Sequence, residues 1–102
     1  MDIENIILEK MGEFSFRRAK IIADSKFGDK IKLKIKFYQS ILDGYVNIDK
    51  EWDDKSTISL ISSRLSSATE AEKRDILSNI MDVYASNPKL KSIISKYKKF
   101  IN

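Results

Sequence analysis

The sequence predicts an all-α protein, a compact bundle of four or five helices. Turn-forming residues are scarce, with three Gly and one Pro in 102 residues, whereas all-β domains need many turns. Apolar residues recur at three- and four-residue intervals, which is the period of an amphipathic helix. The chain is 42% apolar and long enough to bury one core without disulfides, so we expect a single helical domain over residues 1–102.

The first helix is expected over residues 2–25. Its inward stripe is formed by side chains at alternating four- and three-residue steps: Ile7, Met11, Phe14, Arg18 and Ile21. An arginine on an apolar stripe has three interpretations. It forms a buried pair with an acid, reaches the surface along its aliphatic stem, or marks contact with a partner.

Residues 30–37 alternate lysine with apolar residues, which fits either a strand or a helix. A helix over residues 29–46, capped by Asp29, accommodates all the large apolar residues of the segment. Its two apolar stripes predict a central helix packed on two sides. The alternative is an α+β fold with a hairpin at 30–48, turning at Asp43-Gly44.

The next residues, 47–53, are polar and predict a connection without regular structure. Asp53 or Asp54 is a suitable N-cap for a third helix over about 54–67. Thr69 followed by Glu72 forms a capping box, which predicts the start of a helix over 70–86.

The last helix is expected over 88–101, with Asn87 as N-cap and Pro88 in the first helical position. Leu90, Ile93 and Tyr97 recur at helical spacing and form part of its inward face. Its lysines take the opposite side.

Cysteine and histidine are both absent from the chain. This composition excludes thiolate and imidazole zinc sites as well as Ser-His and Cys-His catalysis. Isolated acidic pairs and isolated glycines match no metal-binding or phosphate-binding loop. We therefore expect a protein that is not an enzyme and needs no metal or cofactor.

Positive charge is concentrated in two blocks. Residues 17–36 carry eight bases and two acids, a net charge of +6, and residues 88–102 carry five lysines and no acid. Such blocks predict contacts with a partner or with nucleic-acid phosphates. The candidate contact residues are the following bases: Arg17, Arg18, Lys20, Lys30, Lys34, Lys96, Lys98 and Lys99.

The single tryptophan, Trp52, stands among acids in Glu51-Trp52-Asp53-Asp54. Tryptophan is enriched where one partner anchors in another, so Trp52 is a candidate partner anchor. The alternative is that it packs into the core at a helix start.

These features predict a small accessory or regulatory protein that binds a partner protein through charged helical faces. The alternative is a nucleic-acid-binding accessory protein that uses segments 17–36 and 88–99. The abundance of Ile and Lys, 16 and 15 residues against four Arg, suggests AT-rich codons and a phage, plasmid or viral origin.

Membrane binding is not expected, since no apolar run approaches the roughly 20 residues that span a bilayer. The acidic N-terminus lacks the basic-then-apolar order of a signal peptide, so a cytoplasmic location is expected, in a cell or an infected host. Self-association into a homo-oligomer stays open.

Overall fold

The computed structural model describes residues 2–101, and this range consists of helices and their connections, without a strand. The elements are α1 (Asp2–Met11), α2 (Glu13–Phe27), α3 (Ile31–Leu42), α4 (Ile48–Trp52), α5 (Lys55–Ser67), α6 (Glu70–Met81), the 3₁₀ turn η1 (Tyr84–Ser86), α7 (Leu90–Lys96) and the 3₁₀ turn η2 (Lys98–Phe100). The all-α prediction is confirmed. The expected four or five helices are corrected to seven α-helices in the described residues, and the hairpin at 30–48 is wrong because 31–42 form one helix.

Gly12 divides the expected first helix into α1 and α2. Its φ of 87° lies in the left-handed region, which glycine enters without a steric cost and which interrupts the α-helical path. The break turns Met11 and Phe14 outward, with 39% and 48% of their surface exposed, although the spacing predicted both to point inward. The stripe is thus buried only at its other positions, among them Ile7.

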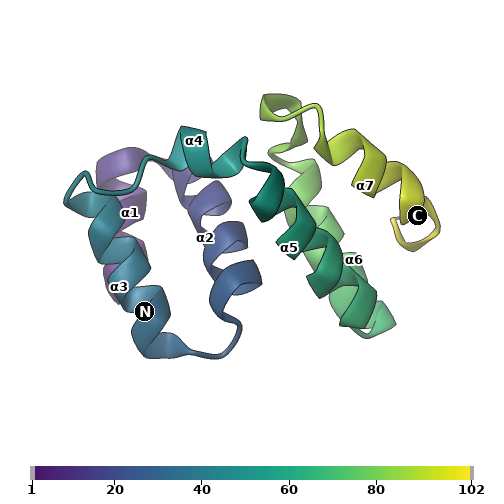
Figure 1. The fold of residues 1–102 in the computed structure, drawn as a ribbon, viewed down its shortest axis with the longest axis horizontal. Coiled ribbons are helices and arrows are strands. Elements are labelled where there is room, and N and C mark those ends of the chain that lie inside the picture. Colours follow the sequence, from purple (N-terminus) through teal and green to yellow (C-terminus); the bar gives the residue numbers. More distant parts are fainter. Residues whose placement is uncertain (1, 102) are drawn as a thin grey trace.

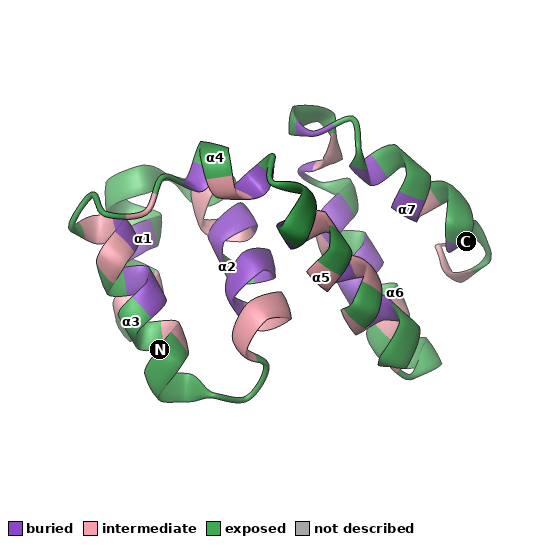
Figure 2. Cartoon of the chain, in the orientation of Figure 1, coloured by how far each residue is buried: buried purple, intermediate pink, exposed green. Residues whose placement is uncertain are grey.

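Helix α2 is the centre of the molecule. It packs against α1 and α3 on one side and against α5 and α6 on the other, while α4 crosses one end (Figure 1). Ala19 and Ala23 are fully buried on α2, and their small side chains let neighbouring helices approach closely. Figure 2 shows how much of α2 is buried compared with the outer helices.

Helix α3 is a peripheral helix rather than the expected central one. It packs mainly against α1 and α2 at one end of the molecule, and α7 lies at the opposite end (Figure 1). Its buried residues, Phe37, Tyr38 and Ile41, share one side of the helix. The ring of Phe37 lies 5.8 Å from that of Phe27 on α2. Both apolar stripes of α3 are therefore buried in the C-terminal half of the helix and exposed in its N-terminal half.

The expected connection at 47–53 contains the short helix α4. The Asn47 side chain caps it by accepting hydrogen bonds from the backbone N–H groups of Asp49 at 2.9 Å and Lys50 at 3.2 Å. Asp54 caps α5 by accepting from the Ser56 N–H at 2.8 Å, as predicted. Asp29, by contrast, does not cap α3, whose N-cap position is Lys30 without a side-chain cap.

Thr69 caps α6 as predicted, because its Oγ1 accepts from the Glu72 N–H at 3.2 Å. The second half of the capping box differs, since the Glu72 carboxylate accepts from the Thr69 hydroxyl at 2.8 Å. The helix ends at Met81 rather than residue 86. The last helix begins at Leu90, and Asn87 does not cap it. The Asn87 side chain accepts from the Lys89 N–H at 3.1 Å, which is the predicted capping contact, but it lies in a turn that precedes α7.

Buried apolar side chains form one cluster that extends from α1 through α2 to α7. Within residues 2–101, none of the helices combines the length and the apolar character needed to cross a bilayer.

Candidate functional site

Arg17 is held by two acids instead of facing solvent as a free cation. Its guanidinium lies 2.7 Å from Glu13, one turn earlier, and 2.9 Å from Asp82 at the end of α6. The hydrogen bond to Glu13 raises the pKa of Arg17, and the charges of both acids add to the effect. Arg17 therefore ties α2 to α6.

Asp24 is shared by two other candidate bases, Lys20 and Lys34, and by Arg64. Its carboxylate lies 2.7 Å from Lys34 of α3, 3.4 Å from Lys20 of its own helix and 3.8 Å from Arg64 of α5. The carboxylate is largely buried, with 18% of its side chain exposed. Lys20 and Lys34 thus face an acid at the centre of the bundle, which weakens the positive potential of this surface.

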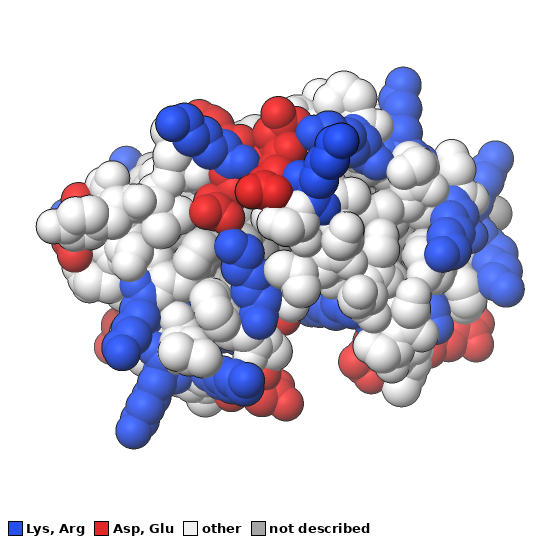
Figure 3. Space-filling view, in the orientation of Figure 1, with Lys and Arg blue, Asp and Glu red and all other residues white. Residues whose placement is uncertain are grey.

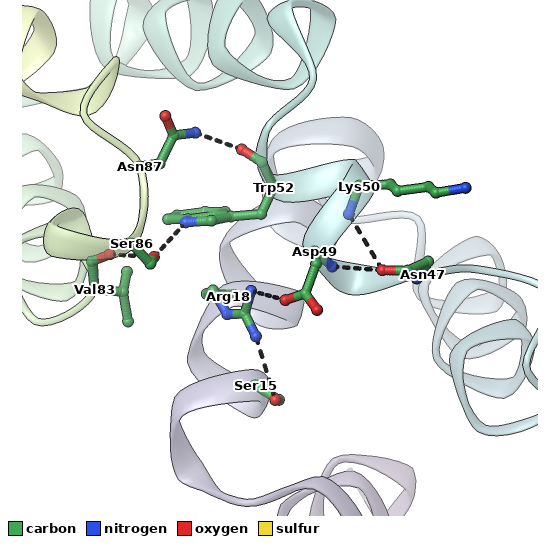
Figure 4. A network of polar contacts seen from close by, with 9 residues as sticks. All are labelled: Ser15, Arg18, Asn47, Asp49, Lys50, Trp52, Val83, Ser86 and Asn87. Atoms are coloured by element: carbon green, nitrogen blue, oxygen red, sulfur yellow. Dashed lines mark hydrogen bonds and ion pairs between the residues drawn. The ribbon is translucent and has the colours of Figure 1, made fainter.

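Arg18 is buried and paired with an acid, as one interpretation of the sequence predicts, but 81% of the side chain of its partner Asp49 is exposed. Only 9% of the Arg18 side chain is exposed, and its Nη1 donates to Asp49 of α4 at 2.6 Å (Figure 4). The guanidinium also lies 4.9 Å from the centre of the Phe14 ring. Arg18 therefore positions α4 across the end of α2.

Trp52 is a core residue, with 1% of its surface exposed. Its indole Nε1 donates to Ser86 Oγ at 2.8 Å, and its carbonyl accepts from Asn87 Nδ2 at 2.6 Å (Figure 4). The residue thus joins α4 to the segment before α7. In this position Trp52 has almost no surface that a partner could contact. Its burial agrees with the alternative that it packs into the core.

Of the candidate contact residues in the first basic block, only Lys30 forms no ion pair within the described residues. Together with Lys32 and Lys36 it is exposed, and none of the three forms an ion pair with another described residue. Helix α3 contains no acidic residue. Its outward side therefore keeps its positive charge.

The same side of α3 exposes large apolar residues. Ile31 is 58% exposed, and Leu33 and Ile35 are each 40% exposed. At about 100° per residue, Ile31 and Ile35 lie along one edge of the outward side and Leu33 along the other, with the exposed lysines Lys32 and Lys36 between them. We call these residues and Lys30 the α3 face.

Exposed apolar residues are unevenly distributed over the molecule. Among residues 2–101, large hydrophobic side chains that are exposed fall at positions 6, 8, 11, 14, 31, 33, 35, 45 and 81. All but Met81 precede α4 in the chain. Patches of this kind mark interaction surfaces more often than other surface does.

The second basic block lies around α7 and η2. Lys96, Lys98 and Lys99 are exposed, and none forms an ion pair within the described residues. In Figure 3, lysine side chains project over α3 at one end and over α7 at the other, with acidic side chains near α4 between them. On the face that Figure 3 shows, acidic side chains thus interrupt the basic surface between the two ends.

Sequence reasoning assigned Lys30 and Lys34 alike to a contact surface and did not include Lys32 or Lys36 among the contact residues. The structure separates them differently, since Lys34 turns toward Asp24 and the other three stay outside. The spacing separates Lys34 from Lys32 and Lys36, but not from Lys30, which lies one turn earlier on the same side. Lys34 shares a side of the helix with Tyr38 and Ile41, whereas Lys32 and Lys36 lie well away from that stripe.

In comparisons with known proteins, the chain matches no family model, no curated protein and no solved structure, so no function comes to it by likeness.

Proposed function

We propose that this chain is a non-enzymatic interaction module that binds a partner protein through the α3 face. The observation that carries the proposal is the combination of exposed Ile31, Leu33 and Ile35 with unpaired lysines on a helix that contains no acid. The fitting partner segment presents a row of acidic residues flanked by apolar ones. Such a segment complements both the charge and the apolar edges.

The layout of the α3 face favours a protein over a membrane. A helix that lies on a bilayer buries a broad apolar face and keeps its lysines on the opposite side. In α3 the broad apolar side is already used against α1 and α2, through Phe37, Tyr38 and Ile41. The lysines occupy the middle of the remaining surface, where they would separate its apolar edges from the lipid.

The apolar edges also favour a protein over nucleic acid at this position. A phosphate backbone attracts the lysines but offers no matching surface for Ile31, which is more than half exposed. A protein partner buries both kinds of side chain at once.

Apolar burial at the α3 face alone does not give net affinity. Burying the exposed half of three aliphatic side chains is worth about 3 kcal/mol in total, against an association cost of at least about 4 kcal/mol. The interface therefore has to extend to neighbouring residues. Tyr45 is 86% exposed in the turn after α3, and its N–H donates to the Ser40 carbonyl at 2.9 Å, which keeps the turn beside the helix end.

A synthetic peptide tests this function. The probe is an amphipathic helix with a row of Glu flanked by Leu, compared with a scrambled peptide of the same composition by fluorescence anisotropy. We expect the ordered peptide to bind more tightly than the scrambled one. The double variant K32E/K36E should weaken its binding at least about tenfold, because like charges then face each other.

The matched control is K91E/K98E, which changes the net charge by the same amount at the other end of the molecule. It should leave peptide binding near the wild-type value. Equal losses in both double variants, or equal binding of both peptides, would contradict the proposal, since either result would mean attraction by net charge alone.

A further inference from the structure

A shallow pocket lies at the other end of the molecule from the α3 face. It has a volume of about 420 Å³, within the usual range for small-molecule sites. Three helical segments supply its lining: Ser66 of α5, Lys73 of α6, and Lys96, Tyr97, Lys99 and Phe100 from α7 onward. No acidic residue is among the described residues that line it.

The three lysines of this pocket keep their charge uncompensated. None forms an ion pair with a described residue, and Lys73 uses one of its three protons to donate to the Ala68 carbonyl at 2.9 Å. Lys99 lies 5.1 Å from the centre of the Phe100 ring and Lys96 lies 5.6 Å from that of Tyr97. The aromatic rings thus hold the ammonium groups near the pocket without neutralising them.

A larger pocket elsewhere in the molecule differs from the lysine pocket because acids and bases both line it. It has a volume of about 490 Å³ and lies where α1 and α2 meet α5 and α6. Arg17, Lys20 and Arg64 line it, but so do three acids, and ion pairs join several of these groups. Its charges balance, whereas those of the lysine pocket do not.

The hydroxyl groups of Ser66 and Tyr97 in the lysine pocket already donate hydrogen bonds within the protein. Ser66 Oγ donates to the Ser62 carbonyl at 3.0 Å, so the Tyr97 hydroxyl is the donor in its 3.1 Å contact with Ser66. This leaves the lysines as the donors to a bound group. Three ammonium groups around one opening suit a ligand that carries several anionic oxygens.

We propose that this pocket binds the phosphate group of a nucleotide or of a single-stranded nucleic acid. Lys73, Lys96 and Lys99 would donate to the phosphate oxygens. Phe100, which is partly exposed, borders the pocket, and an attached nucleoside would share its ring with Lys73 and Lys99, whose ammonium groups lie 5.4 and 5.1 Å from the ring centre. The inference goes beyond the proposed function, because it concerns another site and another class of ligand.

Titration with inorganic phosphate, a nucleoside triphosphate and a short single-stranded oligonucleotide tests this site and separates its two sources of phosphate. Binding of the triphosphate and the oligonucleotide indicates a nucleotide site, and binding of the oligonucleotide alone indicates a nucleic-acid site. With three lysines engaged, raising salt from about 50 to about 200 mM should weaken oligonucleotide binding about 20-fold.

The informative variant is K73Q/K96Q/K99Q, which should lose phosphate binding at least about tenfold. Its matched control is K10Q/K50Q/K55Q, which removes the same charge from exposed lysines that line no described pocket. The control should bind as the wild type does. Circular dichroism checks that both triple variants are folded. If K73Q/K96Q/K99Q is not folded, the single variant K96Q replaces it in the titration.

Equal losses in both triple variants, or no binding of any probe at about 50 mM salt, would overturn this site. The K73Q/K96Q/K99Q variant should still bind the acidic peptide at α3. Failure of the phosphate site is therefore distinguishable from failure of the proposed function.

Discussion

Trp52 shows how one residue joins two parts of the fold. Its ring is buried, its indole nitrogen donates to Ser86, and its carbonyl accepts from Asn87. Ser86 in turn donates to the Val83 carbonyl at 2.7 Å, so each polar group in this chain of contacts has a partner. The role of Trp52 is therefore structural, and its loss should act on stability.

Replacement of Trp52 by alanine should lower the free energy of unfolding by about 3–5 kcal/mol, because it removes a large buried ring and leaves a cavity. Trp52→Phe keeps most of the packing but loses the hydrogen bond to Ser86, so about 1–2 kcal/mol is expected. Urea unfolding followed by circular dichroism measures both.

Tyr45→Ala is the control for this experiment. Tyr45 is 86% exposed, and the substitution should change stability by less than about 0.5 kcal/mol. An unchanged urea midpoint for Trp52→Ala would mean that the ring is not part of the core.

At the scale of helices, the sequence predicted helix caps in which a side chain accepts a hydrogen bond from the backbone of its own segment. Thr69 and Asp54 cap the helices that they were predicted to cap, because a cap depends on residues two or three positions away. The break at Gly12 was missed, since periodicity continues across it and only the backbone conformation reveals it.

The cap at Asp54 makes the stability of α5 depend on pH. The hydrogen bond from the Ser56 N–H, with a second from its hydroxyl, lowers the pKa of the Asp54 carboxyl. The folded pKa is then below the unfolded one, so the stabilisation is complete above the unfolded pKa of about 3.9. It is lost as the pH falls through the lower folded value.

Asp54→Asn separates the charge from the cap, because asparagine also accepts the N-cap hydrogen bond but does not titrate. The stability of the wild type relative to this variant should therefore decline as the pH falls below about 4. Urea midpoints of both proteins over a series of pH values test this. A difference between them that stays constant down to about pH 2 would contradict the role of the carboxylate.

At the scale of the whole molecule, ion pairs engage the candidate bases of α2 and Lys34, while the lysines of the α3 face and of the α7 end form no ion pair within the described residues. The sequence located both basic blocks, but not which bases are neutralised. The partners of Arg17 and Arg18 include acids 65 and 31 positions away, Asp82 and Asp49, which only the folded chain brings near. Lys73 was missed at the α7 end for the same reason, since it comes from α6.

This distribution of ion pairs gives the molecule two chemically different ends. The α3 face combines lysines with exposed aliphatic side chains, and the end around α7 combines lysines with aromatic rings. The first combination suits an acidic protein segment and the second suits phosphate.

The most direct test of the α3 face is an NMR titration of the isotope-labelled protein with the acidic amphipathic peptide. We expect the largest changes in amide chemical shift at residues 30–36 and in the turn at Tyr45, with little change in α5, α6 and α7. Changes centred on α7, or spread evenly over all exposed lysines, would contradict the assignment of the partner-binding surface to α3.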